Sequence, residues 1–366
     1  MKNYLILIAL VFVPLISSAQ DLAAYNNYLD HFFIFDHGRS IKVEDLRVTS
    51  FAVGAECVLY INSQGNLCLY KDTVVTKLEG GGVTAYYATD HLAAYAIFQK
   101  LKVIENGVPV TLSTHCPIYR VKDSLIAFYD SDKESLRIYY KGIVSDIESG
   151  LLGKPVDKIS VGENTVAYIS SLTNDFKIWY NGSVTSIISN IGDIPFMAGR
   201  DIVVYINKLD NTFHAYYKGN DYVLENFVPI SYKLGDGFVA YVSNTGDFKV
   251  FYDGQVSTLM SYVPTKYIVS DNLLFYDDGN YFRAFWKGQT VELETFIPDV
   301  FSVDWNSLVY LDNTNRVWLF SDGEKKYLLN DLITYIKNYR DLIIMGAKIN
   351  RTIIYYKGKT YEGSVL

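Results

Sequence analysis

The sequence predicts an all-β fold, a β-propeller built from about ten repeats of about 35 residues with short antiparallel strands. Three observations lead to this prediction. One short phrase recurs along the chain, the glycine that ends it returns at a nearly constant interval, and its apolar residues fall on both faces of the predicted strand. A fixed period in this range is typical of stacked or circular repeat architectures.

The phrase reads FKVFYDG at 248–254, FKIWYNG at 176–182, FHAYYKG at 213–219 and FRAFWKG at 282–288. Its last glycine recurs at intervals of 40, 37, 35, 34, 35 and 35 residues. The aligned glycines are Gly142, Gly182, Gly219, Gly254, Gly288, Gly323 and Gly358. The same step taken backwards finds earlier copies that end at Gly107, Asp72 and Gly38. The period therefore predicts ten copies, from about residue 21 to the C-terminus.

Each copy follows one plan of up to four short strands. A first short stretch leads into a strand with an aromatic residue, then come a polar loop, the repeated phrase and a last strand. The aromatic column consists of Tyr95, Phe128, Tyr168, Tyr205, Tyr241, Tyr276 and Tyr310. The phrase ends in Lys-Gly, Asn-Gly or Asp-Gly, and these pairs suit the positive φ angles of a tight hairpin turn. Four-stranded units with apolar residues on both faces are typical of propeller blades, which pack between two neighbours.

An open stack of the same repeats is the main alternative, but it needs capping units at both ends. We prefer a closed ring, and a single ring of ten blades over two smaller rings, because no Gly/Pro/Ser linker interrupts the period. The first copy starts near Leu22 and leaves no room for a first strand. We therefore expect one blade to be short of a strand, or to borrow one across the closure, with the two termini side by side.

Residues 1–19 have the pattern of a signal peptide, with Lys2, an apolar run from Leu5 to Ile16 and small residues before Gln20. The propeller would then occupy residues 20–366. No later stretch is long and apolar enough for a transmembrane segment in the mature chain. We expect an exported protein that resides in the periplasm, with a secreted or cell-surface location as the alternative.

The composition and the motifs argue against several classes of function. The formal net charge of −7 argues against a nucleic-acid partner. No nucleophile elbow, phosphate loop or metal-ligand pattern occurs, so we expect no enzyme activity, no catalytic residues, no cofactor and no metal. The acidic stretches at 130–135 and 277–280 are interpreted as turns rather than calcium loops. Cys57, Cys68 and Cys116 form an odd set; we favour buried free thiols over a bridge between Cys57 and Cys68.

A column of cations is the most specific internal pattern. It lies five residues before the aligned glycine and consists of Lys102, Arg137, Lys177, His214, Lys249 and Arg283. These six residues are candidate binding residues for an acidic ligand. The alternative, which we favour, is that each cation packs on an aromatic ring or pairs with a carboxylate.

The repeat lacks the signatures of WD40 and kelch propellers. With its signal peptide and its Tyr, Asn and Gly content it is similar to exported propellers of the envelope of bacteria that use type 9 secretion. That resemblance implies a non-catalytic scaffold for protein–protein interaction, a periplasmic subunit of an outer-membrane secretion or translocon complex with an envelope protein as its partner. The alternative is a lectin-like propeller that binds glycans or small ligands through Trp179, Trp286, Trp305 or Trp318. An enzyme with its site at the ring axis is the third hypothesis.

Overall fold

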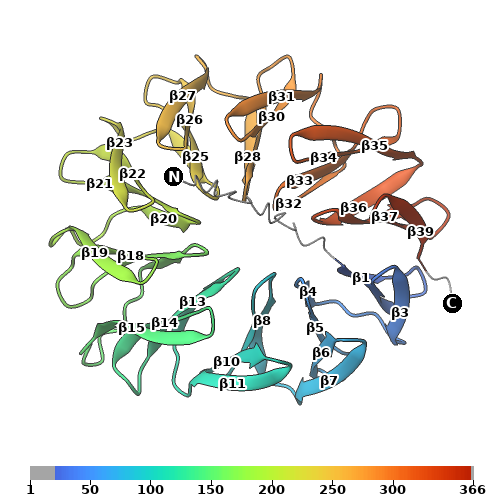
Figure 1. The fold of residues 1–366 in the computed structure, drawn as a ribbon, viewed down its shortest axis with the longest axis horizontal. Helices are drawn as coiled ribbons and strands as arrows, with labels where there is room; N and C mark the ends of the chain where they lie inside the picture. The colour runs from blue at the N-terminus through green and yellow to red at the C-terminus, as the bar shows by residue number, and fades with distance from the viewer. Residues whose placement is uncertain (1–20, 364–366) are drawn as a thin grey trace, which may run out of the picture.

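The computed structural model describes residues 21–363, and the predicted signal peptide lies outside them. Within this range the chain forms strands, turns and loops and no helix. The strands make ten antiparallel sheets that follow one another around a ring, as Figure 1 shows. The prediction of an all-β propeller with ten blades is therefore confirmed.

Blade 1 has three strands, β1 (Leu22–Asn26), β2 (Phe32–Asp36) and β3 (Arg39–Glu44). The other nine blades have four strands each, ordered from the axis to the rim. Blade 2 contains β4 (Phe51–Val53), β5 (Val58–Ile61), β6 (Leu67–Lys71) and β7 (Val74–Glu79). Blade 3 contains β8 (Val83–Ala88), β9 (Ala93–Ile97), β10 (Lys100–Glu105) and β11 (Val108–Ser113). Blade 4 contains β12 (Ile118–Lys122), β13 (Leu125–Asp130), β14 (Ser135–Tyr140) and β15 (Ile143–Ser149). Blade 5 contains β16 (Ile159–Val161), β17 (Thr165–Ile169), β18 (Phe176–Tyr180) and β19 (Ser183–Ile188). Blade 6 contains β20 (Phe196–Gly199), β21 (Ile202–Asn207), β22 (Thr212–Tyr217) and β23 (Asn220–Glu225). Blade 7 contains β24 (Ser231–Leu234), β25 (Phe238–Val242), β26 (Phe248–Tyr252) and β27 (Gln255–Met260). Blade 8 contains β28 (Lys266–Ser270), β29 (Leu273–Asp277), β30 (Phe282–Trp286) and β31 (Gln289–Glu294). Blade 9 contains β32 (Phe301–Asp304), β33 (Ser307–Leu311), β34 (Arg316–Ser321) and β35 (Glu324–Asn330). Blade 10 contains β36 (Ile333–Tyr339), β37 (Leu342–Ala347), β38 (Arg351–Tyr356) and β39 (Lys359–Glu362).

The two middle strands of each blade are buried on both faces, because neighbouring blades cover them. In β26, Phe248 and Val250 pack in a cluster with residues of blade 8, including Tyr276. Phe251, on the opposite face of the same strand, packs in a cluster with residues of blade 6, including Phe213. The apolar residues on both faces, from which the fold was predicted, thus join three successive blades.

The predicted hairpin turns have the expected backbone. At the end of β26, Asp253 has a φ of 48° and Gly254 a φ of 78°, and Tyr252 pairs with Gln255 across the turn. Two successive positive φ angles define the type I′ turn, whose twist matches that of the strands it joins. The second residue is usually glycine because it takes a positive φ without steric cost.

A β-bulge recurs in blades 1 to 9 where the outermost strand pairs with its neighbour. In blade 6, Phe213 faces Glu225 while His214 faces Val223, so Leu224 is the additional residue. The additional residue is aliphatic in all nine blades: Val43, Leu78, Leu112, Ile147, Ile187, Leu224, Leu259, Leu293 and Leu328. The bulge allows two neighbouring side chains to share one face, an apolar one and the carboxylate that often follows it.

The ring closes between blades 10 and 1 through side chains, and blade 1 borrows no strand within residues 21–363. Ala23, Phe33 and Phe35 share one apolar cluster with Ile344 and Ile354 of blade 10. Lys357 also lies 2.8 Å from the carboxylate of Asp21, the first described residue. The short blade predicted from the sequence is therefore present, and its neighbour covers it directly.

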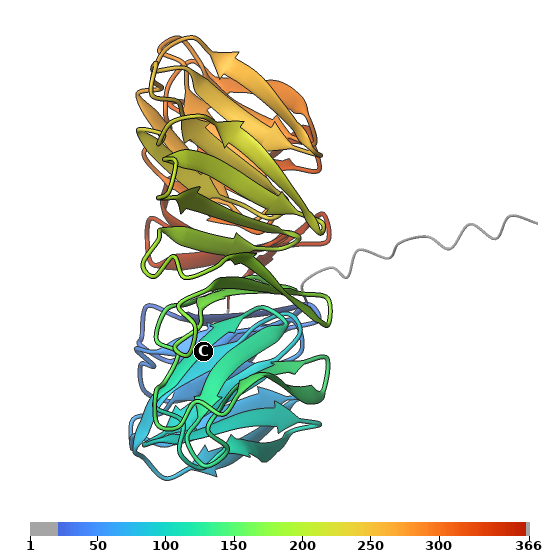
Figure 2. The ribbon, with the colours of Figure 1, turned by 90° about the vertical axis from the view of Figure 1, so that its left-hand side faces the viewer.

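The strands run between two ends of the ring, which Figure 2 shows from the side. The turn end carries the hairpin turns between the first and second and between the third and fourth strands of each blade. The loop end carries the loops between the second and third strands and the connections from blade to blade. The two ends differ in chemistry, as described below.

Candidate functional site

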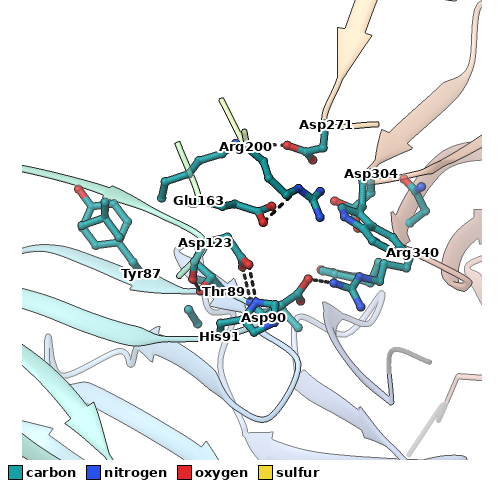
Figure 3. A pocket seen from close by; sticks show the side chains of 18 of the residues that line it. Tyr87, Thr89, Asp90, His91, Asp123, Glu163, Arg200, Asp271, Asp304 and Arg340 are labelled. Carbon is teal, nitrogen blue, oxygen red and sulfur yellow. Dashed lines mark hydrogen bonds and ion pairs between the residues drawn. The ribbon is translucent and has the colours of Figure 1, made fainter. Parts of the chain in front are cut away.

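Nine inner hairpin turns converge around the axis at the turn end, and most carry a charged residue at the tip. The tip residues are Ala55, Asp90, Asp123, Glu163, Arg200, Asp236, Asp271, Trp305 and Arg340. Seven of these nine tips surround a cavity of about 520 Å³ together with inner-strand residues such as Lys122 and Lys337. Figure 3 shows the labelled acidic and basic side chains pointing toward one another across this space.

In several blades, a hydrogen bond joins the inner hairpin turn to the inner hairpin turn of the next blade. The hydroxyl of Thr89 donates to the carbonyl of Asp123 (2.6 Å), and that of Ser124 donates to the carbonyl of Glu163 (2.8 Å). Thr165 donates in the same way to the Gly199 carbonyl at 2.7 Å. Backbone groups held by such bonds are fixed relative to one another, so the charged tips lie on a rigid frame.

Two ion pairs cross the ring. Lys122 of blade 4 lies 3.2 Å from the carboxylate of Asp271 in blade 8. Arg340 of blade 10 pairs with Asp90 of blade 3. Burial disfavours the charged form of Lys122, but the nearby carboxylates of Asp271, Asp236 and Glu163 together outweigh burial and raise the lysine pKa. Polar side chains thus fill space at the axis that the ten blades leave open.

Arg200 links four successive blades. Its guanidinium lies 3.3 Å from Glu163, 2.8 Å from Asp236 and 3.3 Å from the side-chain oxygen of Asn272. Burial raises the pKa of Glu163 to about 7, and the nearby Asp236 carboxylate adds to the rise. A buried carboxyl with a raised pKa inside a cavity is a typical feature of ligand and proton-transfer sites, although structural networks produce it as well.

The wall formed by blades 9 and 10 contains an unused acceptor. The guanidinium of Arg340 lies over the ring of Trp305 at 4.3 Å, and its backbone N–H donates to Asp304 at 2.8 Å. Burial raises the pKa of Asp304. Asn338 is fully buried and donates to the Ser307 hydroxyl at 2.9 Å, while its side-chain oxygen has no hydrogen-bond partner within residues 21–363. This wall therefore presents the aromatic ring of Trp305 to the cavity and contains a buried acceptor without a partner among the described residues.

The structure does not bring the six cations of the predicted basic column to one site, because they are spread around the blades. Every one of them has a carboxylate partner: Lys102 with Glu79, Arg137 with Asp130 and Asp146, Lys177 with Glu148, His214 with Asp221, Lys249 with Glu225, and Arg283 with Asp278 and Glu292. An acidic ligand would have to compete with these carboxylates.

The partners alternate around the ring. The lysines of blades 3, 5 and 7 bond to a glutamate of the preceding blade, at 2.7, 2.8 and 2.7 Å. The arginines and the histidine of blades 4, 6 and 8 bond to carboxylates of their own blade. In blade 9 Trp318 takes the aligned position, and Lys325 from the neighbouring strand reaches Glu294 of blade 8 at 2.7 Å. Odd-numbered blades 3 to 9 are thus held to the blade before them.

Three of the four tryptophans lie outside the axial cavity. Trp179 is buried in the core, Trp286 and Trp318 pack against a core cluster, and Trp305 lines the cavity.

The three cysteines are buried free thiols, and burial raises the pKa of Cys57 to about 11 and that of Cys116 to about 12. Across residues 21–363 no group of three or more His, Cys, Asp or Glu residues is placed to hold a metal ion. No helix in that range could cross a membrane.

Large apolar side chains are exposed in the loops of the loop end. Ile349 is 90% exposed, Phe98 77% and Leu209 73%, all in loops between second and third strands. Leu152 and Phe227, in connections between blades, add to them. Among the described residues, the hairpin turns of the turn end expose no large apolar side chain. The four most exposed large apolar side chains of residues 21–363 therefore all lie at the loop end.

Sequence reasoning missed the axial cavity. The signal was a polar tip between the first and second strands of successive copies, as in GDG at 235–237 and SDN at 270–272. Asp, Asn and Gly are ordinary turn residues, so this pattern alone predicts only turns. Arg200, Trp305 and Arg340 break the acidic pattern, and these substitutions could have indicated a distinct site.

The family comparison matches residues 16–361 to the 10-bladed beta propeller domain. No curated protein sequence matches. Among solved structures, the computationally designed Ika8 protein is 14% identical with a TM-score of 0.35, covering 92% of this chain and 99% of its own. The CRINKLY WD40 ectodomain of the Arabidopsis thaliana receptor kinase ACR4 is 10% identical with a TM-score of 0.37, covering 67% of this chain and 97% of its own. Prp20p from Saccharomyces cerevisiae is 12% identical with a TM-score of 0.34, covering 59% and 75%. By the domain match, which spans nearly the whole chain, the protein belongs to the family of 10-bladed beta propeller domains.

Proposed function

We propose that the protein is a non-catalytic scaffold for protein–protein interaction in the bacterial cell envelope. The observation that carries this proposal is the apolar loop end. Water disfavours exposed apolar side chains, so a partner that covers those of the loop end gains binding free energy. Ile349, Phe98 and Leu209 stand at loop tips on three different blades, so a partner would contact several blades at once.

The loops of this face carry charged residues of both signs beside the apolar ones. Lys208 and Asp210 flank Leu209 in one loop, and Lys348 precedes Ile349 in another. Interfaces of this type combine a dry apolar centre with a charged rim that sets orientation and association rate.

The signal-peptide pattern of residues 1–19 supports export, with a mature chain from Gln20 onward that is a periplasmic subunit of an outer-membrane complex. Fractionation of the native cells tests this location: the protein should be released with the soluble periplasm or the envelope. Recovery of the protein with an intact N-terminus in the cytoplasm would refute export.

Affinity purification from native envelopes tests the interaction itself. Wild-type protein should retain a stoichiometric partner, and replacing Ile349 and Phe98 together with serine should release it. Ile143 provides the matched control, because it is 66% exposed but lies on β15 at the rim. Loss of the partner from Ile143→Ser alone, with retention by the double variant, would contradict the assignment of this face.

A second candidate function is the binding of a small polar ligand in the axial cavity. It is favoured by the cavity that Trp305 and Asn338 both line, because the side-chain oxygen of Asn338 has no hydrogen-bond partner within residues 21–363. Screening sugars and polar metabolites by thermal shift tests it: a ligand should stabilise the wild type and not Trp305→Ala. A ligand that stabilises both proteins equally would place its site elsewhere.

A further inference from the structure

Blade 1 leaves an open position at the ring axis where each of the other nine blades has an inner strand. β1 is the innermost strand of its blade, and it contacts β37 of blade 10 and β4 of blade 2. A cavity of about 490 Å³ borders it, lined by Asn26 of β1, Phe51 of β4, and Tyr335 and Lys337 of β36. We call this cavity the blade 1 slot.

The backbone of β1 is oriented to pair with a further strand. The N–H of His37 donates to the carbonyl of Asp21 at 3.1 Å, and that of Asn27 donates to the carbonyl of His31 at 3.0 Å. In an antiparallel ladder the bonded residues alternate, so Ala24 and Asn26 direct their backbone groups away from β2. The Ala24 carbonyl accepts a hydrogen bond from the Tyr339 hydroxyl of blade 10 at 3.2 Å, which agrees with this direction.

Other blades show what these backbone groups bond to when an inner strand is present. The residue after the aromatic of the second strand donates its N–H to the residue just before the inner strand. This bond occurs from Ile61 to Ser50, from Ile169 to Lys158, from Ile206 to Pro195 and from Leu311 to Val300, at 3.0 to 3.2 Å. Asn26, which follows Tyr25, is the corresponding donor in blade 1.

The slot also has the chemistry of a peptide groove. Tyr335 is 44% exposed and Phe51 half-buried, so apolar side chains can pack on both walls. Lys337 lies over the ring of Tyr339 at 5.5 Å and makes no ion pair with a carboxylate of residues 21–363. An acidic residue in an added strand would pair with this lysine.

The sequence indicates which kind of strand fits. Residues 16–18, Ile-Ser-Ser, stand at the same distance before Tyr25 as Ile159-Ser160-Val161, the inner strand of blade 5, stands before Tyr168. Cleavage before Gln20 would remove this segment. The mature chain would then keep the slot without its own strand.

We propose that the mature chain accepts an extended segment of its protein partner as the fourth, innermost strand of blade 1, by β-strand addition. The segment is short, alternates apolar and small residues, and carries an acidic residue opposite Lys337. This inference deepens the proposed function and rests on its export step.

The experiment uses the mature chain, residues 20–366, and a fluorescent peptide with the sequence of residues 14–19, Pro-Leu-Ile-Ser-Ser-Ala. Fluorescence anisotropy should show saturable binding, and hydrogen exchange should slow at the amides of Ala24 and Asn26. Ala24→Pro removes the inward N–H and should weaken binding about tenfold, the effect of one lost hydrogen bond. Ala24→Gly keeps the N–H and should bind like the wild type.

A chain that retains residues 1–19, produced without export, should bind the peptide at least about tenfold more weakly, because its own segment competes. If Ala24→Pro does not fold, Lys337→Met replaces it and should weaken binding of an acidic version of the peptide only. The proposal is overturned by a mature chain that fails to bind, by a folded Ala24→Pro variant that binds normally, or by a native protein whose N-terminus precedes Ile16.

These outcomes separate the slot from the scaffold function. If envelopes yield no partner but the peptide binds and protects Ala24, the slot stands and the proposed function falls. If wild type and Ala24→Pro recover the same partner equally, the function stands and the slot falls.

Discussion

Replacement of Glu225 by alanine should cost the ring about 2–4 kcal/mol, because one oxygen of this glutamate holds two side chains of the next blade. The Tyr241 hydroxyl donates to it at 3.1 Å and the Lys249 ammonium at 2.7 Å. Tyr241 is fully buried, so its unpaired hydroxyl should cost about 1–3 kcal/mol. Lys249 is one-fifth exposed, and the loss of its partner should cost about 1 kcal/mol, between the values for surface and buried pairs.

Urea unfolding monitored by fluorescence and circular dichroism measures this loss. Glu225→Gln keeps an acceptor for Tyr241 and should cost about 1–2 kcal/mol, and a double-mutant cycle with Lys249→Ala should give a coupling of about 1 kcal/mol. Glu324→Ala, at an exposed site without an ion pair to a described residue, is the control and should stay within about 0.5 kcal/mol of the wild type. A loss below about 0.5 kcal/mol for Glu225→Ala would refute the argument that these contacts hold odd-numbered blades to the blade before them.

Three further predictions concern the axis and the loop end. The pKa of Glu163 is raised to about 7, so the folded state keeps a proton that the unfolded chain releases above about pH 4.5. The stabilisation from this carboxyl is therefore lost as the pH rises from about 4.5 to about 7. Glu163→Gln should flatten the fall in melting temperature between pH 5 and pH 7, and an unchanged pH profile would contradict the raised pKa. Asp90→Asn should cost about 2–4 kcal/mol in urea unfolding, because it removes the carboxylate that pairs across the ring with the Arg340 guanidinium, which is 13% exposed. Arg340→Met should cost less than half as much, because the Asp90 carboxylate is 25% exposed to water; the reverse order would show that the pair does not bridge the ring. Ile349→Ser should change the free energy of unfolding by less than about 0.5 kcal/mol, and a larger loss would show that the side chain packs within the ring.

The blades could be predicted because their signals are local. The period, the turn pairs such as Asp253–Gly254 and the apolar residues on both faces of β26 all lie within one copy of the repeat. Because every copy of the repeat carries the same signals, the strands of a copy with a weak signal can be predicted from the other copies. The three-stranded blade followed from the same count, since Leu22 leaves no room for a strand within the period.

The axial cavity could not be predicted, because its contacts are not local. Lys122 and Asp271 are 149 residues apart in sequence, and Arg340 and Asp90 are 250 apart. Their pairing depends on how the ring closes, which no pattern within one copy contains. The basic column could be predicted only in part. Its alternation of lysine with arginine or histidine is visible in the sequence. Whether each cation joins two blades depends on whether its carboxylate partner belongs to the same blade or to the preceding one, and the sequence does not show this.

The missing strand of blade 1 brings the closure of the ring, the slot and the axial cavity to one place. Phe51, Lys337 and Tyr339 line both the slot and the axial cavity. Tyr339 also donates the hydrogen bond that joins blade 10 to β1. A strand added in the slot would therefore contact the same walls that face the axis, and it would pair with β1 where side chains alone now close the ring. Because an added strand supplies a ladder of backbone hydrogen bonds, binding there should stabilise the closure as well as recruit a partner. A partner held at this position would thus act as a structural part of the ring.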